Sequence, residues 1–159
     1  MTRIQAEGGE FDAYVAPADP AGPPVLLLHA WWGLTQQIKD MADRFAAAGF
    51  TVLAPDLFNG TVLTTIEEAE AHGEDEEAMS GRYAEVVVAA LDSLLARQDV
   101  TGDKAAVIGF SFGVWYGTQV AEARPEVTAM VNIYGGMVAP DDVAFLGHFA
   151  ENDPFVDSS

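Results

Sequence analysis

The chain has 159 residues, of which 50% are hydrophobic, and a formal net charge of −18 at pH 7. This length suits one sizeable core and is too short for two ordinary domains, so we expect a single domain over residues 1–159. The negative charge disfavours nucleic acids and anionic membrane surfaces as partners. The absence of cysteine excludes disulfides, thiolate metal ligands and cysteine nucleophiles.

The sequence shows no recognisable targeting segment. No apolar run approaches the roughly 18 residues that a membrane-spanning helix needs, so we expect no membrane span. The first residues have no basic stretch followed by an apolar segment, which a secretory signal would require. We therefore expect a cytoplasmic location.

The first third of the chain predicts a hairpin, two strands and a helix. Loose alternation around Gly8-Gly9 predicts a β-hairpin over residues 4–16. The continuous apolar run at residues 25–29 is typical of a strand that is buried on both faces of a parallel sheet. Apolar residues at helical spacing predict a helix over residues 36–48, and a further strand covers residues 51–54.

The rest of the chain continues this alternation of strands and helices. Residues 59–80 are less regular and acidic, and we expect a mobile excursion above the sheet. Such an order is typical of a mostly parallel sheet with helices on both faces, in which chemistry lies at the carboxyl ends of the strands. The predicted elements are helices over residues 82–97 and 114–123 and strands over residues 104–110, 127–134 and 143–149.

A nucleophile motif follows the predicted strand at residues 104–110. Gly109-Phe110-Ser111-Phe112-Gly113 matches G-x-S-x-G, in which a sharp turn lifts the serine above the sheet at the start of a helix. The helix dipole and free N–H groups there favour developing negative charge. We therefore interpret Ser111 as a nucleophile; the alternative is a tight turn that happens to contain serine.

Acyl transfer also needs oxyanion donors and an acid. The backbone N–H of Phe112 follows the nucleophile, and the N–H of Trp31, after an earlier strand, is the second expected donor. Trp31 and Trp32 could instead be packing residues. Asp153 follows the strand at residues 143–149, in the order nucleophile then acid; capping of a turn by Asp153, or Glu151 as the acid, are the alternatives.

Four segments of the chain resemble the dienelactone hydrolase family of the α/β-hydrolase fold. The resemblance implies hydrolysis of a small ester or lactone without a metal or an organic cofactor. It also implies an α/β-hydrolase sheet that lacks its last strand and helix. The segments are residues 27–33, 49–58, 109–113 and 148–156, and the run from Gly49 to Phe58 is the most specific.

Three features depart from the family pattern. The family usually has cysteine where this chain has Ser111, and its founding members have glutamate at the position of Ala30. The family's catalytic histidine follows the acid by a few tens of residues, whereas the chain ends at Ser159, six residues after Asp153. We therefore expect a truncated chain that is inactive by itself and has exposed apolar edges that favour a homodimer.

The three histidines of the chain offer no obvious replacement base. We expect His29 to orient the oxyanion loop and His72 to be solvated. His148 matches a family histidine that is not the base, although it is an alternative base here. No two histidines have metal-ligand spacing, so no metal site is expected.

Two functions therefore remain open. The first is a serine ester hydrolase with a partly apolar pocket formed by Trp32, Phe58 and Phe110, while Trp115 and Tyr116 could pack beneath the elbow. Arg82 could meet a substrate carboxylate or could lie on a solvated helix end. The second function is a non-catalytic protein of the same fold that binds a small acyl ligand or a partner protein.

Overall fold

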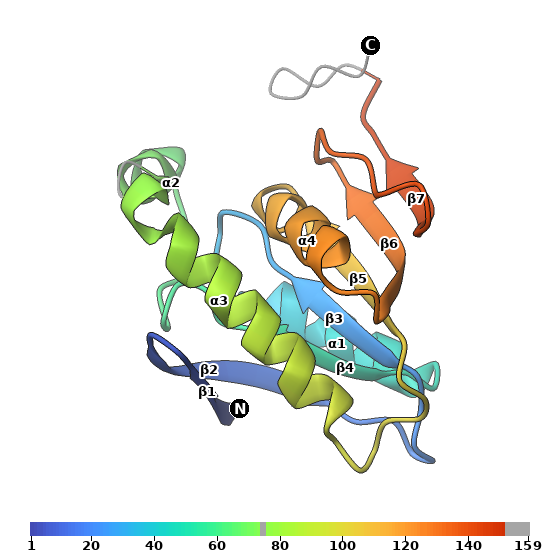
Figure 1. The fold of residues 1–159 in the computed structure, drawn as a ribbon. Coiled ribbons are helices and arrows are strands. Elements are labelled where there is room, and N and C mark those ends of the chain that lie inside the picture. The colour runs from blue at the N-terminus through green and yellow to red at the C-terminus, as the bar shows by residue number, and fades with distance from the viewer. Residues whose placement is uncertain (74–75, 152–159) are drawn as a thin grey trace.

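A computed structural model describes residues 1–73 and 76–151 of the chain. In this part of the chain, seven strands form one sheet in the order β1-β2-β4-β3-β5-β6-β7 (Figure 1). The strands are β1 Thr2–Ala6, β2 Gly9–Ala16, β3 Pro24–Leu28, β4 Thr51–Pro55, β5 Ala105–Phe110, β6 Val127–Ile133 and β7 Ala144–His148. The helices are α1 Gln36–Ala47, α2 Ile66–Gly73, α3 Glu76–Leu95 and α4 Phe112–Ala123.

The sheet is mostly parallel, as the order of the predicted elements indicates. Strands β1 and β2 form the expected antiparallel hairpin, and β2 pairs antiparallel with β4. All pairings from β4 through β3, β5 and β6 to β7 are parallel. The carboxyl ends of these five strands therefore meet at one edge of the sheet, which we call the carboxyl edge.

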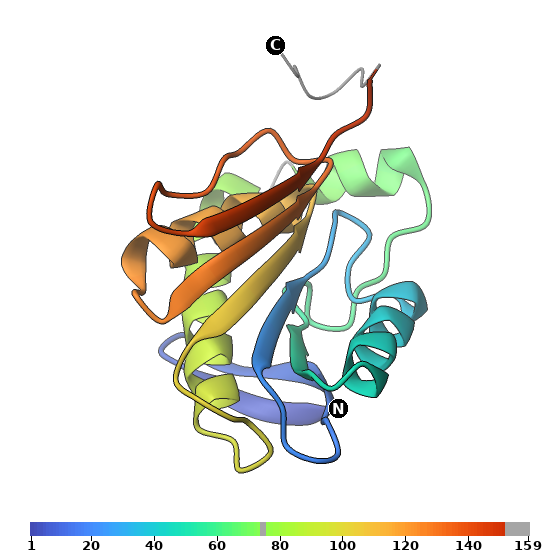
Figure 2. The same cartoon turned by 90° about the vertical axis from the view of Figure 1, so that its right-hand side faces the viewer.

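Helices cover both faces of the sheet (Figure 2). Helix α1 packs on one face, and α3 and α4 pack on the other. Within β3, Leu26 contributes to the core under α3 and α4, while Leu27 contributes to the core under α1, and neither side chain is exposed. The continuous apolar run therefore is a strand buried on both faces, because alternate side chains enter two separate cores.

The segment before residue 82 differs from the prediction. It contains α2, and α3 begins at Glu76 rather than at Arg82. Helix α2 begins with a capping box: the Glu68 N–H donates to Thr65 Oγ1 at 3.2 Å, and Glu68 Oε2 accepts from the Thr65 N–H at 3.2 Å. The T-x-x-E pattern was a sequence signal for this helix, and the surrounding acidic composition obscured it.

Strand β7 forms one edge of the sheet. Among the described residues, no strand pairs with its outer edge, and the side chains of Phe145 and Leu146 are 38% and 54% exposed. This agrees with an α/β-hydrolase sheet without its last strand and helix. No helix in the described ranges is both long and apolar enough to cross a membrane.

Candidate active site at the carboxyl edge

Ser111 lies at the junction between β5 and α4. Its backbone has φ 46° and ψ −110°, a conformation that is costly for a residue other than glycine. Hydrogen bonds hold this turn: the Ser111 N–H donates to Ile133 O at 3.0 Å, and the Ser111 carbonyl accepts from the Val114 N–H at 2.9 Å. Such strain is typical of a nucleophile elbow at a strand-to-helix turn.

Two glycines make room for this turn. A Cβ atom at Gly113 would lie 2.6 Å from Leu28 O and 2.7 Å from His29 O. A Cβ atom at Gly109 would lie 2.8 Å from the backbone N and Cα of Val114. Both contacts are far shorter than van der Waals distance, so the motif needs glycine on either side of the serine because backbone segments approach each other there.

The side chain of Ser111 makes no hydrogen bond that caps α4, although the residue occupies the N-cap position. The residue is half-buried, and no acidic residue lies in the first turn of α4. The hydroxyl of Ser111 therefore has no role in capping the helix; the alternative of a tight turn that happens to contain serine is not tested by this observation. The backbone N–H of Phe112 belongs to the first turn of α4, where helix N–H groups lack intrahelical partners.

His29 connects the loops that follow β3 and β4. Its ring is not exposed; Nδ1 lies 2.8 Å from Ala30 O, and Nε2 accepts the Leu57 N–H at 3.1 Å. Because Nε2 accepts, Nδ1 carries the proton and donates it to Ala30 O. Burial lowers the pKa of His29 to about 4, so the imidazole is neutral at pH 7. The expectation that His29 orients the oxyanion loop agrees with this geometry.

The oxyanion loop itself is a tight turn. The Gly33 N–H donates to Ala30 O at 3.1 Å, and Gly33 has φ 82°. A Cβ atom at Gly33 would lie 2.3 Å from Thr61 O, so only glycine fits there. The Trp32 carbonyl accepts the Leu63 N–H at 3.1 Å. Trp31 is 41% exposed, and its role as an oxyanion donor stays a prediction.

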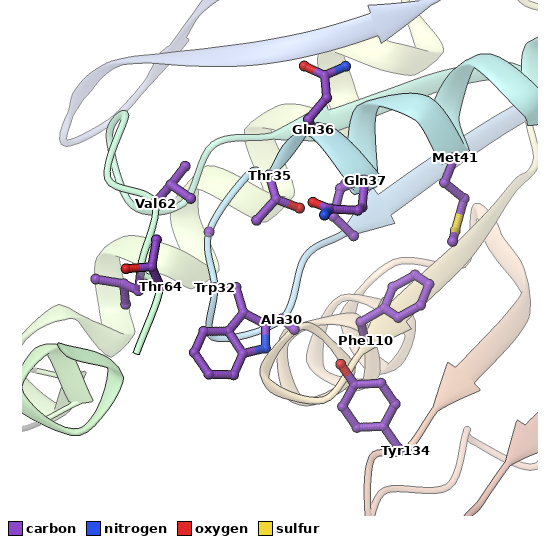
Figure 3. Close-up of a pocket in the computed structure, with 13 residues that line it drawn as sticks. Ala30, Trp32, Thr35, Gln36, Gln37, Met41, Val62, Thr64, Phe110 and Tyr134 are labelled. Atoms are coloured by element: carbon purple, nitrogen blue, oxygen red, sulfur yellow. The ribbon is translucent and has the colours of Figure 1, made fainter. Parts of the chain in front are cut away.

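A cavity of about 660 Å³ adjoins the elbow (Figure 3). Its walls come from the oxyanion loop, the start of α1, the loop that precedes α2 and the ends of β5 and β6. Phe110, the residue before Ser111, lines this cavity together with Trp32, as expected for a pocket at the carboxyl edge. Tyr134 also lines it, with its ring centroid 6.4 Å from that of Phe110; the sequence analysis missed this residue.

Comparison with known proteins identifies the family. The sequence profile of the dienelactone hydrolase family matches residues 11–159. The chain belongs to the dienelactone hydrolase family. The carboxymethylenebutenolidase homolog of Mus musculus is 30% identical over 154 residues, which cover 91% of this chain and 62% of the mouse protein.

Two further proteins are similar to this chain in sequence or fold but are longer. The protein usf of Aquifex pyrophilus is 29% identical over 140 residues, which cover 85% of this chain and 61% of that protein. The solved structure of m3DLH has a TM-score of 0.84 and 25% identity, and the match covers 99% of this chain and 70% of m3DLH. The match thus spans a little over three fifths of the length of the Aquifex pyrophilus and Mus musculus proteins.

Phe58 does not line the cavity, in contrast to the prediction from sequence. It is 5% exposed, and its ring centroid lies 5.3 Å from that of Phe112 and 4.9 Å from that of His29. His72 is half-buried rather than solvated, because its ring packs against Phe58 at 4.3 Å. Tyr116 is 1% exposed and packs beneath the elbow, whereas Trp115 is 51% exposed and does not.

Arg82 lies at the hairpin rather than at the site. Its guanidinium donates to Gly8 O at 2.7 Å and to Glu10 O at 3.4 Å, so it ties α3 to the turn between β1 and β2. The alternatives for Arg82, a substrate carboxylate or a solvated helix end, are therefore both replaced by a structural contact. Periodicity places a residue on a helix face but does not say which distant loop meets that face.

The remaining predicted residues lie at the end of the chain. Asp153 lies outside the described residues, so its role stays a prediction; Glu151, the competing acid, is exposed. His148 ends β7 and is exposed. Within the described ranges, no three His, Asp or Glu side chains group closely enough to hold a metal ion.

Proposed function

We propose that the chain is the larger part of a carboxylic ester or lactone hydrolase that uses Ser111 as its nucleophile. The observation that carries this proposal is the strained backbone of Ser111 at the β5–α4 turn, where the half-buried residue does not use its side chain to cap the helix. Such strain persists only where the surrounding structure enforces it, and it is typical of functional sites. The family name and the mouse relative, named for a butenolide, support an ester or lactone substrate.

In the proposed mechanism, Ser111 Oγ attacks the substrate carbonyl while a histidine accepts its proton. The backbone N–H groups of Phe112 and Trp31 stabilise the oxyanion of the tetrahedral intermediate, and Asp153 orients the histidine. The intermediate then expels the alcohol, which takes the proton, and water hydrolyses the acyl-serine in the same way. We also propose that the protein is cytoplasmic and that this reaction needs no cofactor.

The histidine is the open element of this mechanism. Both ring nitrogens of His29 make backbone contacts inside the core, so His29 is not free to accept the Ser111 proton. We propose that the base belongs to a part of the protein beyond these 159 residues, and that this chain alone is inactive. The second candidate function, a non-catalytic binding protein, is favoured by the engagement of His29 in backbone contacts.

A fluorophosphonate probe tests the proposal and separates the two functions. We expect an adduct on Ser111, located by peptide mass spectrometry, in a version extended to the natural stop codon and not in the 159-residue chain. The Ser111→Ala variant should abolish labelling of the extended version, whereas Ser93→Ala, a matched change on α3, should leave it. Absence of an adduct in the extended version would contradict the enzyme and support the binding protein.

A further inference from the structure

Among the described residues, no ionised side chain lines the cavity beside the elbow. Its polar lining consists of hydroxyl and amide groups, and the rest is apolar. Burial raises the pKa of Tyr134, which keeps its phenol neutral at pH 7. The polar lining residues are Thr35, Gln36, Gln37, Thr64 and Tyr134.

All seven lysine and arginine residues of the chain lie in the described ranges. Arg3 and Arg82 are held at the β1–β2 hairpin. Three more pair elsewhere with carboxylates or a backbone carbonyl: Arg97 with Asp99, Lys104 with Pro125 O, and Arg124 with Asp92 and Glu126. None of these five lines the cavity.

The two remaining cations lie on α1 but outside the cavity lining. Lys39 acts on the buried carboxylate of Asp56, whose pKa it lowers against the larger effect of burial. Arg44 lies seven residues after Gln37, about 10 Å further along the helix axis at 1.5 Å per residue. Neither residue lines the cavity, so a carboxylate bound there would meet no cationic partner.

An unpaired carboxylate in such a site is costly. Moving a charged group even partly out of water without a cationic partner is unfavourable, and the apolar part of the lining offers a carboxylate no hydrogen bond. The start of α1 lines the cavity and favours negative charge, but the attraction of a helix N-terminus at an exposed site is small. The net charge of −18 adds long-range repulsion of anions. A carboxylate in this cavity is therefore disfavoured relative to a neutral group of similar size.

We propose that this cavity selects uncharged esters or lactones and rejects substrates that carry a carboxylate near the scissile bond. This inference rests on the proposed function and narrows its substrate class. It separates the chain from its mouse relative, whose name refers to a butenolide with a carboxyl group. The N–H groups at the start of α1 then contact a neutral carbonyl or ether oxygen, which costs less free energy to remove from water than an ion does.

Binding of two matched amides tests the inference without requiring catalysis. N-(4-nitrophenyl)butyramide and N-(4-nitrophenyl)succinamic acid differ by a terminal carboxylate and resist hydrolysis. Equilibrium dialysis with the 159-residue chain should show at least about tenfold weaker binding of the succinamic acid, which corresponds to about 1.4 kcal/mol. The Gln37→Arg variant, which adds a cation at the cavity wall, should shrink this ratio several-fold.

Two control variants separate a local from a general charge effect. Gln5→Arg adds the same charge on the β1–β2 hairpin, and Gln37→Met changes the cavity wall without a charge; neither should shrink the ratio. Equal binding of the two amides, binding of neither amide, or an equal effect of Gln37→Arg and Gln5→Arg would overturn the inference. If the chain still preferred the neutral amide but the extended version formed no probe adduct on Ser111, only the proposed catalysis would be overturned.

Discussion

The buried imidazole of His29 links two loops of the site at the scale of a single residue. It donates to the oxyanion loop and accepts from the loop after β4, so both loops depend on its neutral form. Protonation would remove the acceptor at Nε2 and place a charge in the core. Because the two loops depend on neutral His29, we expect acid to destabilise them.

This link predicts a specific pH dependence of stability. The pKa of His29 is lowered to about 4 in the fold, against about 6.5 in the unfolded chain, so the unfolded state binds the proton first. The resulting stabilisation, about 3 kcal/mol, is complete above pH about 6.5 and is lost as the pH falls towards about 4. Urea unfolding at several pH values should show this loss relative to His29→Gln, which cannot titrate. An NMR signal assigned to the His29 imidazole that titrates near pH 6.5 would contradict the prediction.

The close approach at Gly113 predicts a large effect of a single methyl group. In Gly113→Ala, the added Cβ would collide with Leu28 O and His29 O, both of which are backbone atoms that cannot rotate away. We expect the free energy of unfolding to fall by about 2 kcal/mol or more. Probe labelling of Ser111 in the extended protein should also fall, since the elbow must shift.

Gly81 provides the matched control for this substitution. It lies in α3, is exposed, and a Cβ atom there would meet nothing within 4 Å. Gly81→Ala should therefore raise the free energy of unfolding, by about 0.5–1 kcal/mol, because alanine loses less backbone entropy in a helix. If both variants changed stability in the same direction, close backbone packing at the elbow would not be the cause.

At the scale of elements, β7 is the most exposed strand of the described sheet. Leu146 and Phe145 point to opposite faces of the strand, and both are more than a third exposed. The register pairs Leu146 with Val131 of β6, which is only partly buried under the α1 face. An exposed apolar edge of this kind favours pairing with a second chain.

We therefore expect the 159-residue chain to self-associate through β7. Sedimentation velocity should show a larger species that grows with protein concentration, and Leu146→Lys should reduce it because charge opposes edge pairing. Val62→Lys, a change at a comparably exposed apolar residue outside the sheet, is the control and should have little effect. A monomer at all concentrations would contradict the expected homodimer.

At the scale of the whole molecule, charge repulsion is the dominant long-range force. The net charge is −18, and most ion pairs in the described structure lie at partly exposed sites, where each contributes little. Salt screens repulsion between surface charges that lie further apart than the Debye length, which is about 10 Å at 0.1 M. The folded state, which holds the acids closer together than the unfolded chain, should gain more from this screening.

Salt should therefore stabilise this protein. Between about 10 mM and 500 mM NaCl, we expect the Tm to rise by several degrees, because screening removes repulsion. A variant with Glu70→Gln and Glu122→Gln, two exposed positions on α2 and α4, should start from a higher Tm and gain less. A Tm that falls with added NaCl would show that the attractive pairs dominate instead.

Local patterns in the sequence were sufficient for the fold and the elbow. The parallel sheet, the hairpin around Gly8-Gly9 and the turn at Ser111 follow from apolar periodicity and from glycines at fixed spacing, which act between near neighbours in the chain. Helix α2 was missed although Thr65 and Glu68 form a capping box. The local signal for α2 was therefore present in the sequence but was not interpreted as a helix start.

Contacts between distant segments decided the rest. The burial of Phe58, the tie between Arg82 and Gly8, and the position of Tyr134 at the cavity depend on how elements far apart in sequence pack together. The sequence by itself determined which residues form strands, helices and the strained turn, because those choices are local. Only the tertiary structure decided that no lysine or arginine lines the cavity of the described residues, because charge at a site depends on which side chains converge there in space.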